Sequence, residues 1–123
     1  MKLSLESAAA ANFIRAYGRG TLTINEETVS RSVIVTPERI IRDWPPQTFE
    51  QLEHAHFEGL AALEPAVVLL GTGARLRFPA PAHGAFLLER GIGLEVMDTA
   101  AACRTYNILA AEGRKVVAAL LMI

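Results

Sequence analysis

With 123 residues and a formal net charge of −1 at pH 7, the chain has the length of one domain and no positive field to attract nucleic acid or an anionic membrane. Apolar residues make up 51% of the sequence, yet no apolar run approaches the ~20 residues of a membrane-spanning helix, so we expect no direct membrane insertion. The single cysteine excludes an internal disulfide, and we expect a soluble, cytoplasmic protein.

The first third of the chain predicts a layer of β-hairpins. Residues 1–12 are expected to form a flexible N-terminal arm, and residues 13–123 a single domain. The β-prone runs are short, rich in β-branched residues and separated by glycine, Asn-Glu-Glu and proline breaks. They occupy residues 13–17, 21–24, 28–35 and 39–43.

The rest of the chain alternates between helical and strand patterns. Thr48 and Gln51 have the spacing of a capping box and predict a helix that ends at Pro65. Apolar runs without polar alternation are typical of strands covered on both faces, and two such strands joined by a helix are normally parallel. We predict such strands at residues 66–70, 92–97 and 116–121, helices at 83–90 and 99–112, and a brief strand at 75–78. The pattern indicates a three-layer α/β domain with a mixed central sheet.

A Gly-Thr-Gly loop and a helix start are predicted to meet at one edge of this sheet. The carboxyl ends of parallel strands in open α/β sheets are where ligands gather, and the free N–H groups of a helix start favour anions. This reasoning predicts a small-molecule or anion pocket, which the charge of Asp98 opposes. The alternative is that the glycines serve a tight turn and close helix packing. The candidate ligand-binding residues are Gly71, Thr72, Gly73, Asp98, Thr99, Cys103 and Arg104.

No catalytic residue, metal ligand set or cofactor is predicted. Cys103 lies near a helix start beside Arg104, which would lower its thiol pKa and suit a thiol switch. The alternative is a small buried residue that fills a gap against the sheet, and no His-Asp pair can be assigned to it. His54 and His56 point to nearly opposite sides of a helix, and His83 is expected at the surface, so no metal site follows.

A family resemblance rests on residues 16–20 (AYGRG), 33–37 (VIVTP), Trp44, 70–73 (LGTG), 95–107 (EVMDTAAACRTYN) and 112–114 (EGR). With these residues the sequence resembles the MTH938-like family, long catalogued as a domain of unknown function. The resemblance implies a three-layer fold with a mixed five-stranded central sheet, and no established catalytic residues. A mitochondrial relative is an assembly factor for respiratory complex I, and the absent presequence indicates a bacterial member.

From the residues and the resemblance together we expect a non-catalytic binding or assembly module with a protein partner. It would aid the assembly of a respiratory or membrane protein complex. The alternative is a small-molecule or anion-binding protein, an unrecognised enzyme, with its pocket at the Gly-Thr-Gly loop and the start of the last helix. The oligomeric state is left open.

Overall fold

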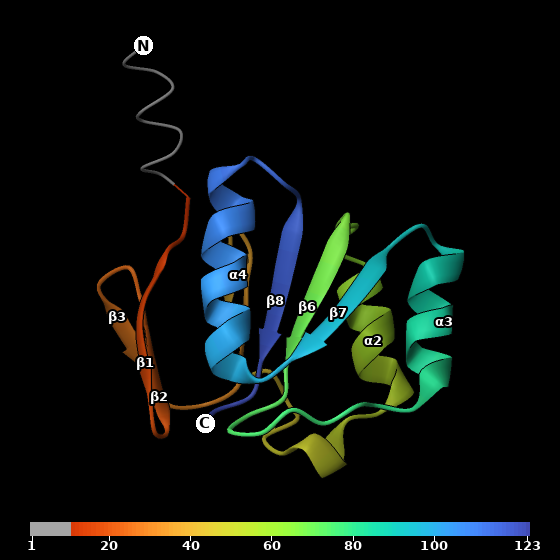
Figure 1. Ribbon diagram of the computed structural model, residues 1–123, viewed down its shortest axis with the longest axis horizontal. Coiled ribbons are helices and arrows are strands. Elements are labelled where there is room, and N and C mark those ends of the chain that lie inside the picture. The colour runs from red at the N-terminus through yellow and green to blue at the C-terminus, as the bar shows by residue number, and fades with distance from the viewer. Residues whose placement is uncertain (1–10) are drawn as a thin grey trace.

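A mixed five-stranded sheet in the order β5-β4-β8-β6-β7 forms the centre of the computed structural model, which describes residues 11–123 (Figure 1). β6 runs parallel to both β7 and β8, and β4 runs antiparallel to β8 and β5. The predicted parallel pairing is confirmed, since Val68 and Leu94 are register partners. The strands are β4 (Val33–Val35), β5 (Ile40–Ile41), β6 (Val67–Gly71), β7 (Gly93–Met97) and β8 (Val116–Leu120).

A second, antiparallel sheet is formed by β1 (Ile14–Gly18), β2 (Thr21–Ile24) and β3 (Glu27–Val29). Within residues 11–123 this is the predicted β-hairpin layer, and β1 lies beside α4 (Thr99–Ala111) (Figure 1). Most of the predicted N-terminal arm, residues 1–10, lies outside the described residues. At its end, the backbone N–H of Asn12 donates to the carbonyl of Pro37 at 2.9 Å.

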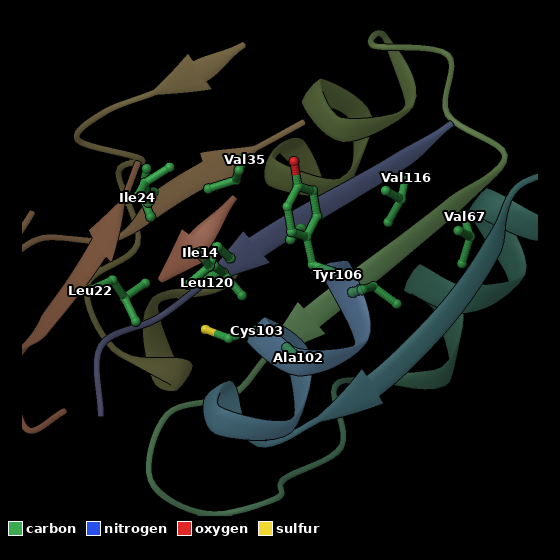
Figure 2. Packing of buried hydrophobic residues seen from close by; sticks show 13 residues of the cluster. Ile14, Leu22, Ile24, Val35, Val67, Ala102, Cys103, Tyr106, Val116 and Leu120 are labelled. Atoms are coloured by element: carbon green, nitrogen blue, oxygen red, sulfur yellow. The ribbon is translucent and has the colours of Figure 1, made fainter. Parts of the chain in front are cut away.

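The central sheet is covered on both faces. On one face lie α4 and the three-stranded sheet, and on the other lie α2 (His54–Ala61) and α3 (Pro81–Glu89) (Figure 1). On β6, Val67 and Leu69 join the core beneath α4, part of which Figure 2 shows, whereas Val68 and Leu70 join the core beneath α2. Side chains of a strand alternate between faces, so two covered faces require an uninterrupted apolar run.

The predicted helix after Thr48 is wrong at its start. Directly after Thr48 lies only a short 3₁₀ helix, η1 (Phe49–Gln51), and the α-helix, α2, begins after Glu53. The side chain of Gln51 cannot close a capping box with Thr48, because its Oε1 accepts from the N–H of Gln47 at 2.7 Å. The capping box that forms instead joins Glu53 and His56.

Two strand predictions also need correction. The run 28–35 is not one strand, because it divides between β3 and β4, which belong to different sheets. At the break, the carbonyl of Ser32 accepts from the N–H of Trp44. Residues 75–78 form no strand, because their backbone bonds the loop itself: Thr72 Oγ1 donates to the carbonyl of Arg75 at 2.6 Å.

Candidate functional site

The Gly-Thr-Gly loop and the start of α4 meet, as the sequence predicts. The loop follows β6 directly, and α4 follows β7, its parallel neighbour. The N–H of Thr72 donates to the carbonyl of Met97, and the N–H of Thr99 donates to the carbonyl of Gly73, both at 2.9 Å. The two segments are therefore bonded directly to each other by their backbones.

Thr99 fills the space between the two loops. Its side chain is fully buried, its Oγ1 accepts from the N–H of Gly73 at 2.8 Å, and its hydroxyl donates to the carbonyl of Leu121 at 2.7 Å. A Cβ built on Gly71 would lie 2.9 Å from Thr99 Oγ1 and 2.9 Å from Cδ2 of Leu120. Gly71 thus allows the helix to approach the sheet closely, which is the structural role considered for this glycine from the sequence.

The N-terminus of α4 is capped by its own chain. A carboxylate oxygen of Asp98 accepts from the N–H of Ala101 at 2.8 Å, so Asp98 is the N-cap residue. A carboxylate at this position satisfies one free N–H group and balances the positive end of the helix dipole. An external anion at this helix start would meet the negative charge of Asp98.

Cys103 and Arg104 point to different environments. Cys103 is 1% exposed and faces Leu22 and the core beneath α4 (Figure 2). Burial raises the pKa of its thiol to about 12, and the smaller effect of the Arg104 charge lowers it only in part. The thiol is therefore protonated at neutral pH, whereas a reactive cysteine needs the thiolate. Arg104 is exposed, and its guanidinium donates to the hydroxyl of Tyr17 at 2.7 Å.

An open depression of about 270 Å³ adjoins the loop on its outer side. Of the seven candidate residues, only Thr72 and Gly73 line this depression. Arg75 and Arg77, which are not among the candidates, line it as well. The guanidinium of Arg77 is engaged by the carboxylate of Glu50 at 2.6 Å, whereas none of the ion pairs within residues 11–123 includes Arg75. The candidate residues thus do not form one site. Thr72 and Gly73 line this depression, Gly71 and Thr99 form the buried contact, Asp98 caps α4, Cys103 lies in the core, and Arg104 is exposed on α4.

An exposed strip runs across β1 and α4, and we call it the β1–α4 surface: Tyr17, Arg104 and Ile108. Tyr17 is 40% and Ile108 59% exposed, and Arg104 bonds the Tyr17 hydroxyl between them. The strip is held rigidly, because the side-chain amide of Asn107 both accepts from the N–H of Ile14 and donates to its carbonyl. Sequence reasoning placed Arg104 at a pocket and missed its aromatic neighbour on a distant strand.

A second cavity, of about 380 Å³, opens near the C-terminal end of α4, away from the predicted site. Its apolar lining includes Leu63 of the segment after α2 and Val116 of β8. Its charged lining residues are Glu38, Arg39, Arg114 and Lys115. Sequence reasoning missed this cavity because its lining comes from several separate turns and helix ends.

Two histidines that the sequence separates by 29 positions meet between α2 and α3. The Nδ1 atoms of His54 and His83 lie 3.3 Å apart. The ring of Phe57 stacks on that of His83, with centroids 4.3 Å apart. Burial, and to a lesser extent the charge of His54, lower the pKa of His83. No spacing rule could have found this pair, because it depends on how the two helices pack.

Neither a membrane-spanning helix nor a metal-binding cluster is found in residues 11–123. No helix in this part of the chain combines the length and apolar character needed to cross a bilayer. In the same residues, no group of three or more histidine, cysteine, aspartate and glutamate side chains is placed to hold a metal ion.

A family model described as "Protein of unknown function (DUF498/DUF598)" matches residues 14–121. Among curated proteins, NADH dehydrogenase [ubiquinone] 1 alpha subcomplex assembly factor 3 from Bos taurus is 31% identical over 113 residues, 90% of this chain and 61% of that protein. The chain therefore spans about three-fifths of the length of this relative.

Solved structures from bacteria share the fold over most of the chain. A crystal structure of a Bordetella parapertussis protein is 42% identical, with a TM-score of 0.87, and the match covers 93% of this chain and 98% of that one. A Mth938-like domain from Bordetella pertussis is 35% identical, with a TM-score of 0.81, and the match covers 91% of this chain and 86% of that one. The expected three-layer fold is thus confirmed.

Proposed function

The chain belongs to the DUF498/DUF598 family, and we propose that it is a non-catalytic module that binds a protein partner and aids the assembly of a respiratory or other membrane protein complex. One observation carries the proposal, namely the 31% identity to an NADH dehydrogenase assembly factor over 90% of this chain. The assembly role belongs to that relative, whose length this chain covers in part, and it is transferred here as a proposal.

The chemistry of the predicted site supports a role without catalysis. The Thr99 hydroxyl is bonded to two backbone groups, and the Asp98 carboxylate is used as a helix cap. Cys103 is buried and protonated at neutral pH. An enzyme needs a nucleophile and a base within reach of a substrate, and these side chains are held by the fold instead.

The β1–α4 surface supports recognition of a protein. It presents a tyrosine, an arginine and an aliphatic side chain on rigid elements, and tyrosine and arginine are the residue types enriched where interfaces gain most of their binding energy. Arg104 is oriented by Tyr17 before any partner binds, which lowers the entropic cost of ordering its side chain. We assign the partner contact to this surface.

Deletion of the gene in the organism that carries it tests the proposed function. Assembled respiratory NADH dehydrogenase should decrease on native gels while its subunits are still synthesised, and the wild-type gene should restore it. Unchanged amounts of assembled respiratory complexes in the deletion strain would overturn the proposal. Turnover of a metabolite by the purified protein would overturn its non-catalytic part.

A small-anion site is the second candidate, favoured by the Arg75 guanidinium at the 270 Å³ depression beside the Gly-Thr-Gly loop. Titration of the protein with phosphate should then shift the amide resonances of Thr72 and Gly73, and an Arg75→Gln variant should lose the response. We also propose a cytoplasmic location, which is supported by the single cysteine, since one free and buried thiol needs no oxidising compartment. Fractionation of cells that express the tagged chain tests this location.

A further inference from the structure

The close contact between the rings of His54 and His83 restricts which of their nitrogens can carry a proton. Their Nδ1 atoms are 3.3 Å apart, and their ring centroids are 5.5 Å apart. One proton can occupy the space between the two nitrogens, so at least one of them must present a lone pair to the other. A metal ion can take the place of that proton, because neutral imidazole nitrogens are ligands for transition metals.

Both rings are held in place by aromatic neighbours. Phe57 stacks on His83 with an interplanar angle of 7°, and the edge contact of Phe86 with His54 has centroids 4.6 Å apart. The two imidazoles come from two helices that pack against each other, so their separation is set by the fold and not by one flexible loop. A metal ion would therefore find two ligands already positioned.

The distance fits the coordination geometry of zinc. Zn–N bonds of about 2.0–2.1 Å at a tetrahedral angle place two ligand nitrogens roughly 3.3–3.4 Å apart. The observed 3.3 Å matches this spacing, so binding requires small ring adjustments and no movement of the helices. Glu58 lies on the far side of His54, with Oε2 4.0 Å from Nε2. At this distance the carboxylate forms no hydrogen bond with the ring, but its negative charge favours a proton on Nε2 over one on Nδ1 and so leaves Nδ1 free for a metal.

We propose that His54 and His83 form a two-histidine site for a divalent transition metal of the Zn²⁺ type, ligated through both Nδ1 atoms. Within residues 11–123 no third protein ligand completes the group, so water fills the remaining positions in the isolated chain. Such a site is open and exchangeable, unlike a four-ligand structural zinc site. The site is accessible from solvent, because the side chain of His54 is 46% exposed.

Calorimetric titration of the full chain with Zn²⁺ alone tests the proposal, using one variant of each histidine. The wild type should bind one equivalent. His54→Gln and His83→Gln should each weaken binding by more than about tenfold, because even an outer-sphere partner of a metal site is commonly worth ~10–100-fold. His56→Gln is the matched control, since His56 lies on the same helix as His54 and is the remaining one of the chain's three histidines. Glutamine at this position keeps a side-chain acceptor for the N–H of Glu53.

A second measurement on the unaltered protein avoids any dependence on how the variants fold. Zn²⁺ should shift the imidazole carbon and nitrogen resonances of His54 and His83 and leave those of His56 in place. Absence of saturable Zn²⁺ binding by the wild type would overturn the proposal. Equal affinity in the wild type and in a His54→Gln/His83→Gln double variant would overturn it as well, because the ion would then bind elsewhere.

Discussion

Replacement of Thr99 by valine should destabilise the protein strongly although the two side chains have nearly the same shape. The hydroxyl is buried between two backbone groups, accepting from the N–H of Gly73 and donating to the carbonyl of Leu121. Valine fills the same volume but leaves both backbone groups without this partner. Each buried group left unsatisfied costs about 1–3 kcal/mol, and the two costs share one site, so we expect roughly 2–4 kcal/mol in total.

The expected loss is large relative to the stability of a domain of this size. With an unfolding entropy of about 2.1 cal/mol/K per residue, a loss of 1 kcal/mol lowers the Tm of a chain this long by roughly 4 °C. Thr99→Val should therefore lower the Tm by roughly 8–16 °C. Thr105→Val is the matched control on the same helix, since Thr105 is half-buried and makes no side-chain hydrogen bond within residues 11–123.

Thermal and urea unfolding followed by far-UV circular dichroism measure both variants. Thr105→Val should stay within about 0.5 kcal/mol of the wild type, as is usual for substitutions away from buried polar contacts. If Thr99→Val were no more destabilising than this control, the hydroxyl would not be a structural bridge. The interpretation that the Thr99 hydroxyl is fully used by its two backbone hydrogen bonds would then fail, and a ligand-binding role for Thr99 would regain support.

Three further predictions concern residues near α4. Gly71→Ala should cost about 1–3 kcal/mol in urea unfolding through overpacking, whereas Gly59→Ala, in open space on α2, should be neutral or stabilising. Native Cys103 should resist thiol reagents at pH 8 and react once the protein is unfolded. Because burial raises the pKa of its thiol to about 12 in the folded protein, the free energy of unfolding should fall by ~1.4 kcal/mol for each pH unit above about 9. Cys103→Ala should flatten this dependence of stability on pH. Asn107→Ala should accelerate hydrogen exchange at the Ile14 amide by freeing β1, and unchanged exchange would refute its anchoring role.

The central strands could be predicted because both of their faces are buried, so that nearly every position of these strands is apolar. Val67 and Val68 point to opposite cores, so β6 contains no polar position, and a short apolar run of this kind is typical of a strand buried on both faces. The division of residues 28–35 could not be predicted in the same way. β-branched residues lie on both sides of the break, and propensity alone does not say that β3 and β4 join different sheets.

The meeting of the two loops could be predicted from the sequence, but what occupies their contact could not. Parallel pairing fixes which strand ends lie together, and this brought Thr72 and Thr99 to one edge. The partner that uses the Thr99 hydroxyl is Leu121, 22 residues later, and nothing local to either residue signals the bond. The same holds for Tyr17 and Arg104, which meet because β1 packs beside α4.

The most direct test of the proposed assembly role compares two exposed aliphatic residues in the deletion strain. Ile108 lies on the β1–α4 surface and is 59% exposed, whereas Leu88 lies on α3, across the central sheet, and is 71% exposed (Figure 1). Each is replaced by glutamate, and assembled NADH dehydrogenase is quantified on native gels. We predict that Leu88→Glu restores the complex and that Ile108→Glu, although folded, does not. Equal restoration by both variants would contradict the assignment of the partner contact to this surface.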